Sequence, residues 1–258
     1  MAQEKKKKKK RAGDIILTIV LVIAICVFTV SAYMLIKYFL EYKEGTDTYD
    51  DISEAVTNED QTLTADIPYI NWNDLKALSD DAIGWIYIPD MVINYPIVKG
   101  EDNDYYLKHM ADGTANSSGA IFMEALNSAD YSDENTIIYG HNMKNLSMFG
   151  SLRKFRDQEF AMEHPVFYIY TEDGIYEYDI FSVRVVEAGG DCYTISFATE
   201  EDYADYLNKA VNDSLVDMAV YPTSKDRIVT LSTCTGNDAT RLVVQGVRGD
   251  KVEVLYGE

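Results

Sequence analysis

The sequence predicts a mainly β domain, a barrel or a sandwich, that follows one apolar span near the N-terminus. Short runs rich in Val, Ile and Tyr alternate with turn residues over most of the chain. Before them lie 22 uncharged, mostly apolar residues, from Ile15 to Ile36. With 258 residues, 47% of them hydrophobic, the chain can bury a core of ordinary size, which excludes wholesale disorder.

The apolar span is long enough to cross a membrane. At about 1.5 Å per residue, a helix over residues 15–36 spans the roughly 30 Å core of a bilayer. The apolar region of a cleavable signal peptide is about 7–15 residues, so an uncleaved anchor fits better than a signal peptide or a buried core helix. Residues 1–14 hold seven basic and two acidic side chains, 7 − 2 = +5. We therefore expect a cytoplasmic basic segment over 1–14, a single-pass anchor over 15–36 and an extracellular remainder.

The remainder of the chain is acidic. The whole sequence has a net charge of −20, which leaves −20 − 5 = −25 on residues 37–258. Such a surface argues against nucleic acid as the main partner, because phosphate binding needs basic side chains. Residues 41–66 are acidic and polar with little periodicity, so we interpret residues 37–66 as a stalk, which can be partly helical. The globular domain is expected over residues 67–258.

Strands are predicted where apolar runs end at turn residues. Three runs precede Pro-Asp, Lys-Gly or Gly; they are 85–88, 93–98 and 136–139. Two further runs flank the hairpin signal Thr171-Glu172-Asp173-Gly174; they are 166–170 and 175–186. The last two runs are 227–234 and 241–247.

Helices are predicted at three places by apolar spacing and caps. Residues 72–78 form a short helix that Asn71 or Asn73 can cap. Two apolar stripes predict the others, and we assign both to core packing; they are Met148, Leu152 and Phe155, and then Tyr203, Leu207, Ala210 and Val211. Thr199 opens the last helix, and the acidic residues after it fit a solvated helix start better than a calcium site; they are Glu200, Glu201, Asp202 and Asp205.

Cys234 is the candidate nucleophile. It closes the run 227–234, where a period of two places Thr230, Ser232 and Cys234 on one face. Arg241 opens the next run, and a two-strand hairpin can bring its guanidinium beside the sulfur, as a reactive thiol requires. The alternative is that Cys234 is a small buried residue and Arg241 a surface charge.

His141 is the candidate acid and base among the three histidines. It follows the run 136–139 and Gly140, at a strand end where catalytic groups often lie. His164 precedes Pro165 in a polar turn, and His109 is equally compatible with packing. The alternative for His141 is an ordinary hydrogen-bonded side chain.

These residues together resemble a known family. Thr230-Leu231-Ser232-Thr233-Cys234 with Arg241 is similar to the TLxTC…R signature of sortases, the cysteine transpeptidases of Gram-positive cell surfaces. Tyr139-Gly140-His141-Asn142-Met143 resembles the histidine segment of class B sortases. So do two motifs near the start of the domain, Gly84-Trp85-Ile86 and Asn94-Tyr95-Pro96-Ile97-Val98. The resemblance covers roughly residues 70–250.

The resemblance implies an eight-stranded sortase β-barrel with N-terminal helices and a long helix inserted before the last two strands. It implies that Cys234 attacks the threonine carbonyl of a C-terminal sorting signal, of the NPQTN or NPKTG kind. His141 would protonate the departing amine and deprotonate the incoming one, and Arg241 would stabilise the oxyanion or thiolate. The partners implied are surface proteins with such a signal and the amine of a lipid II-type peptidoglycan precursor; no cofactor or metal is implied.

The resemblance also implies a set of substrate contacts. They are Ser232, Asn103, Leu107, Tyr193 and Ile195, and ordinary packing is the alternative for each. Cys192 matches no catalytic position, so we interpret it as structural or incidental.

Other functions are compatible with parts of this sequence. Within the family, the acceptor could instead be a lysine amine of a pilin subunit, and both reactions use the same acyl-enzyme. Papain-like enzymes usually place cysteine before histidine, and LD-transpeptidases carry His-Gly directly before the cysteine, so neither fits this chain. A non-enzymatic alternative is a tethered β domain for adhesion or sensing, in which Cys192 and Cys234 form a disulfide.

Overall fold

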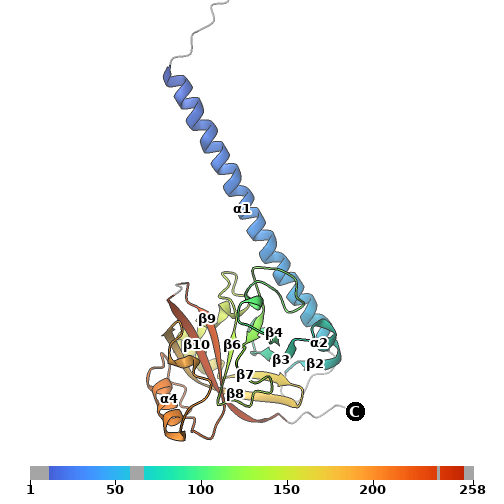
Figure 1. The fold of residues 1–258 in the computed structure, drawn as a ribbon, viewed down its shortest axis with the longest axis vertical. Coiled ribbons are helices and arrows are strands. Elements are labelled where there is room, and N and C mark those ends of the chain that lie inside the picture. The colour runs from blue at the N-terminus through green and yellow to red at the C-terminus, as the bar shows by residue number, and fades with distance from the viewer. Residues whose placement is uncertain (1–11, 59–66, 237–238, 253–258) are drawn as a thin grey trace, which may run out of the picture. The chain divides into compact units, whose positions relative to one another are not determined.

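The structure is a computed structural model that describes residues 12–58, 67–236 and 239–252 (Figure 1). The chain divides into two compact units, Met1–Glu44 and Gly45–Glu258. Most of the predicted basic segment over 1–14, and part of the predicted stalk, lie outside the described residues.

The first unit is helical where it is described. It contains most of α1 (Ala12–Val56), which has one stretch long and apolar enough to cross a membrane. The apolar side chains of this stretch are exposed rather than packed, as in Ile16, Leu17 and Phe28. A buried core helix, one alternative for this span, would instead hide such side chains.

The second unit is a closed barrel of eight strands. The eight-stranded barrel that the resemblance implied is confirmed, and the order of strands around it is β10-β8-β7-β3-β4-β5-β6-β9. The strands are β3 (Ala82–Tyr87), β4 (Asn94–Val98), β5 (Ile121–Met123), β6 (Asn135–Tyr139), β7 (Val166–Thr171), β8 (Gly174–Glu187), β9 (Ile228–Cys234) and β10 (Thr240–Lys251). Only β4–β5 and β6–β9 pair in parallel among the described pairings, and closure leaves the described strands of the barrel without an open edge.

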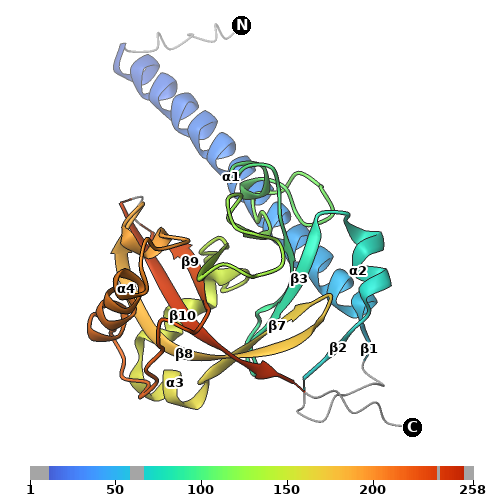
Figure 2. The same cartoon turned by 60° about the horizontal axis from the view of Figure 1, so that its bottom comes forward.

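Helices and short turns surround the barrel (Figure 2). They are α2 (Trp72–Leu78), η1 (Tyr105–Leu107), η2 (Phe149–Arg156), α3 (Gln158–Glu163), η3 (Asp191–Tyr193) and α4 (Glu200–Asn212). Asn71 caps α2, because its side chain accepts hydrogen bonds from the backbone of Asn73 and Asp74. Thr199 caps α4 through the backbone N–H of Asp202.

The helix α4 confirms the predicted inserted helix before the last two strands. Its apolar side packs on the outer side of the barrel, in a cluster made of Phe181, Tyr203, Tyr206, Leu207, Ala210 and Ile228. Figures 1 and 2 both place α4 and α2 on opposite sides of the barrel. Among the described residues, no group of three or more acidic, histidine or cysteine side chains lies together in a way that could hold a metal ion.

The predicted helix around Met148 differs in the structure. Residues 149–156 form a 3₁₀-helix, and Met148 lies before it with a left-handed φ of 51°. Leu152 and Phe155 are nevertheless fully buried, as their spacing predicted. The three-residue strand β5 was not predicted from the sequence at all.

The compact unit begins at Gly45, well before Ile67, where the sequence pattern placed its start. The end of α1 packs on the barrel unit through Tyr49, Ile52 and Val56, which are 4%, 6% and 2% exposed. The strand β1 (Thr57–Asn58) then pairs with β2 (Tyr69–Ile70). Residues 45–58 are therefore part of the globular unit rather than of a free stalk, because their apolar side chains are buried in that unit.

Candidate active site

The parallel pairing of β6 and β9 sets the geometry of the site. Parallel strands end at the same edge of a sheet, and Tyr139 on β6 is the register partner of Ser232 on β9. The backbone N–H of Gly140 donates to the Ser232 carbonyl over 3.1 Å, which continues the pairing past the end of β6. His141 follows Gly140 and Cys234 lies two residues after Ser232, so the two side chains reach one end of the barrel.

Arg241 reaches the same place from the opposite direction. The strands β9 and β10 are antiparallel, and Arg241 is the register partner of Cys234. Directly opposite residues of an antiparallel pair have their Cβ atoms about 4.5–5.5 Å apart. The spacing of seven residues thus forms the hairpin that the sequence predicted, although its tip, Asn237 and Asp238, lies outside the described residues.

These side chains line one pocket of about 210 Å³. Its walls are Asn103, Leu107, Phe122, Tyr139, Gly140, His141, Ser232, Thr233, Cys234 and Arg241. The pocket therefore unites the three predicted catalytic residues with three of the five predicted substrate contacts, Ser232, Asn103 and Leu107.

The other two predicted contacts lie beside this pocket. The Tyr193 hydroxyl is 2.8 Å from Ser232 Oγ, and the Tyr193 ring stacks on Tyr139 with centroids 6.1 Å apart. Burial raises the pKa of Tyr193 to about 12, so its hydroxyl remains protonated at neutral pH. Ile195 is half-buried and is not among the residues that line the pocket.

His141 is fixed by backbone contacts on both sides. Its Nε2 lies 2.8 Å from the Leu107 carbonyl oxygen. Because a carbonyl only accepts, Nε2 must carry the proton in this contact, which leaves Nδ1 for proton exchange. The Phe149 N–H donates to the His141 carbonyl over 3.0 Å. The imidazole is thus held in one tautomer and one orientation, as a proton carrier requires.

Asn142 joins the histidine loop to the candidate nucleophile. Its Nδ2 donates to the Cys234 carbonyl over 2.6 Å, across 92 residues of sequence. The sequence motif contained Asn142, but nothing in the amino-acid sequence indicated which atom its side chain contacts.

Glu124 is a site residue that sequence reasoning missed. It is 9% exposed and accepts from Asn103 Nδ2 over 2.7 Å and from the Tyr139 hydroxyl over 2.8 Å. Burial, with a contribution from this carboxylate, raises the pKa of Tyr139. Glu124 follows β5, which also supplies Phe122 to the pocket, and both escaped prediction because that strand is so short.

The cysteines are free thiols among the described residues. Cys234 is half-buried at the pocket, whereas Cys192 is fully buried. The disulfide required by the adhesion or sensing alternative is therefore not formed. Burial raises the pKa of the Cys192 thiol to about 11, which suits the structural role predicted for it.

Comparisons with known proteins agree with this geometry. Residues 86–249 match the sortase domain family. The chain is 37% identical over 226 residues to sortase B of Listeria monocytogenes, a match that covers 85% of this chain and 91% of that protein. The chain belongs to the sortase family, whose members are cysteine transpeptidases. Within that family it is a class B sortase.

Solved structures support the same assignment. The structure of sortase B from Bacillus anthracis in complex with AAEK1 has a TM-score of 0.74 and 33% identity, over 83% of this chain and 100% of that one. A Staphylococcus aureus sortase B–substrate complex has a TM-score of 0.73 and 26% identity, with the same coverage of 83% and 100%.

Proposed function

We propose that this chain is a membrane-anchored transpeptidase that cleaves a C-terminal sorting signal after threonine and transfers the protein to an amine of the cell-wall precursor. The signal would be of the NPQTN or NPKTG kind. The observation that carries the proposal is the pocket in which Cys234, His141 and Arg241 converge at the ends of neighbouring strands.

The reaction would proceed through two acyl transfers. The Cys234 thiol gives its proton to His141, its sulfur attacks the threonine carbonyl carbon, and Arg241 stabilises the charge that develops on the carbonyl oxygen. The C–N bond breaks as His141 gives a proton to the departing amine, which leaves a thioester on Cys234. The incoming amine attacks this thioester and loses a proton to His141. An amide forms, the thiol is released and the histidine returns to its starting state.

The substrate would lie across the pocket and its flanking wall. Asn103 and Leu107 line one side, while Ser232 and Tyr193 form a hydrogen-bonded pair on the other. We assign Ile195 to the same wall, because it follows Tyr193 by two residues. The Staphylococcus aureus sortase B–substrate complex, a solved structure similar to this chain, supports substrate binding by this fold.

The apolar part of α1 would anchor the enzyme in the cell membrane. Seven basic residues precede it and would remain cytoplasmic, which directs the barrel to the outer face. This orientation would bring the pocket to the compartment in which surface proteins and precursor amines meet.

The experiment uses the full chain in detergent with quenched NPQTN and NPKTG peptides, and a scrambled peptide as control. We expect cleavage between Thr and the next residue, loss of cleavage in Cys234→Ala, and an amide product when a primary amine is added. A lysine-bearing acceptor peptide in a parallel arm tests the pilin-type reaction. Failure to cleave any peptide with Cys234 still alkylatable would contradict the proposed substrate, and cleavage by Cys234→Ala would contradict the proposed nucleophile.

A further inference from the structure

The wall beside the pocket has little regular structure of its own. Residues 191–195 contain one 3₁₀ turn, η3, and link β8 to α4. Local backbone bonds within this segment are few, with Tyr193 N–H donating to Gly190 and Thr194 N–H to Asp191. Since the segment carries Tyr193 and Ile195, contacts from elsewhere must fix its position relative to Ser232.

Asn135 supplies most of these contacts from β6. It is fully buried, and its Nδ2 donates to the carbonyls of Cys192 over 3.0 Å and Thr194 over 2.9 Å. Its backbone N–H donates to the Ile195 carbonyl over 3.2 Å. The Asn135 side chain thus holds positions 192 and 194 of the wall, and its backbone N–H holds position 195.

The other end of the Asn135 amide is fixed as well. Its Oδ1 accepts from the Thr230 hydroxyl over 2.8 Å, and Gln245 Nε2 donates to the same Thr230 oxygen over 2.9 Å. Arg184 Nη2 donates in turn to Gln245 Oε1 over 2.7 Å. The amide therefore has a single orientation, with its two N–H bonds directed at the wall.

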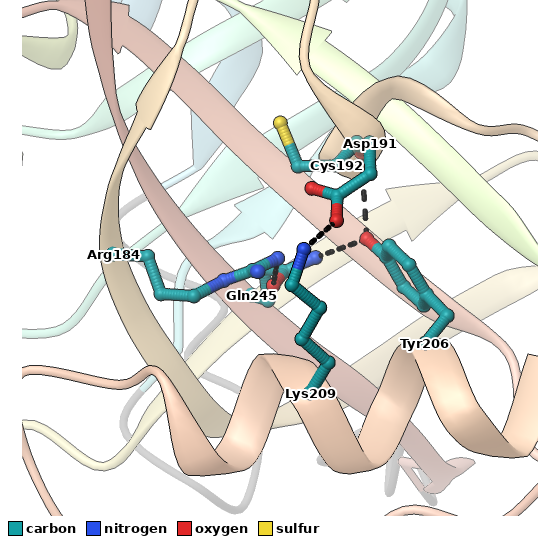
Figure 3. Close-up of polar contacts among 6 residues, drawn as sticks. All are labelled: Arg184, Asp191, Cys192, Tyr206, Lys209 and Gln245. Atoms are coloured by element: carbon teal, nitrogen blue, oxygen red, sulfur yellow. Dashed lines mark hydrogen bonds and ion pairs between the residues drawn. The ribbon is translucent and has the colours of Figure 1, made fainter.

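The inserted helix α4 holds the same wall from its far side (Figure 3). The Tyr206 hydroxyl donates to the Cys192 carbonyl over 3.4 Å and accepts from Gln245 over 2.8 Å. Lys209 pairs with Asp191, but both side chains are about half exposed, so this ion pair adds little. The buried bonds of Asn135 are the main attachment.

We propose that Asn135 is a positioning residue for substrate recognition, which holds residues 191–195 so that the Tyr193 hydroxyl meets Ser232 at the pocket. The inference rests on the proposed function for its effect on catalysis. Asn135 lines no part of the pocket and acts through Tyr193. The position requires an amide, because two carbonyl acceptors need two donors, and a carboxylate of the same shape offers only acceptors.

The test compares Asn135→Asp with wild type in the full chain, with peptide kinetics and hydrogen–deuterium exchange measured on both. Losing buried hydrogen bonds should raise the KM for the sorting peptide about tenfold while kcat changes less than about twofold. Amide exchange over residues 190–197 should become faster. Asn135→Ser, which adds no charge and is too short to reach both carbonyls, replaces the aspartate variant if that variant does not fold.

Asn94→Asp is the matched control, since the same exchange there removes a side-chain N–H that donates to Ser53 Oγ, outside this wall. It should leave both the KM and the exchange of residues 190–197 unchanged. Unchanged amide exchange over residues 190–197 in both Asn135 variants would overturn the inference. So would an Asn94→Asp control whose kcat and KM change as much as those of the Asn135 variant. If wild type cleaves no peptide, the proposed function fails, and the exchange measurement alone still decides whether Asn135 holds the wall.

Discussion

Arg241 and Cys234 face each other as register partners across the antiparallel strands β10 and β9. This relationship places the two residues side by side on neighbouring strands, and both line the pocket. The Arg241 guanidinium also donates from Nη1 to the Thr240 carbonyl over 3.0 Å, which limits its motion. A fixed positive charge requires little reorganisation when negative charge develops at the reacting carbonyl.

Arg241→Gln should lower kcat by about 10²–10³-fold, because in the proposed mechanism the guanidinium stabilises the developing oxyanion. Steady-state kinetics with the sorting peptide measure this loss. The control is Arg248→Gln on the same strand, since Arg248 stacks on Tyr176, 3.5 Å from the ring centroid, away from the pocket. Equal activity in the two variants would contradict the role of Arg241.

Gly119→Ala should lower kcat/KM by about 10–100-fold through displacement of His141. A Cβ atom at position 119 would lie 3.0 Å from His141 Cδ2 and 2.6 Å from the Tyr106 carbonyl oxygen. Gly189→Ala is the control, because Gly189 has a similar φ of +78° but no atom within 4 Å of the new Cβ. Both variants should lose about 1–2 kcal/mol of stability from the left-handed backbone, and only the first should lose activity.

Cys192 should make the fold sensitive to alkali. Burial raises the pKa of its thiol from 9.0 to about 11, so the unfolded chain loses this proton before the folded one. The contribution of Cys192 to the free energy of unfolding is therefore intact below pH 9 and decreases as the pH rises toward 11. Urea unfolding should show wild type losing about 1–3 kcal/mol more than Cys192→Ala over this interval. Parallel profiles for the two proteins would contradict this role of burial.

A fragment of residues 45–258 should be more stable than one of residues 67–258. The longer fragment keeps the buried Tyr49, whose hydroxyl donates to the Gly119 carbonyl over 2.7 Å, together with Ile52 and Val56. Loss of these side chains should lower the free energy of unfolding by at least about 3 kcal/mol. Tyr49→Phe in the longer fragment should cost only about 1–2 kcal/mol. Chemical denaturation measures both, and equal midpoints for the two fragments would contradict the boundary at Gly45.

The sequence patterns predicted the parts of this protein that depend on neighbouring residues. The hairpins β7–β8 and β9–β10 follow from turn residues between apolar runs, and the second hairpin alone places Arg241 beside Cys234. The caps of α2 and α4 also follow from local chemistry.

Contacts between distant segments could not be predicted in the same way. Glu124 and Asn135 act on partners 21 and 59 residues away, and nothing in their immediate sequence indicates those partners. The packing of α1 did leave a signal, since Tyr49, Ile52 and Val56 recur at helical spacing among acidic residues. The acidic residues around them favoured the stalk interpretation. The apolar side of the helix is nevertheless buried in the structure.

The most direct measurement of the central claim is the intact mass of the full chain after brief mixing with an NPQTN or NPKTG peptide in the absence of added amine. We predict an adduct whose mass equals the peptide up to and including its threonine, located on Cys234 by peptide mapping and discharged by an added amine. An adduct on another residue would contradict the thioester mechanism. So would cleavage of the peptide with no adduct on the protein at any time.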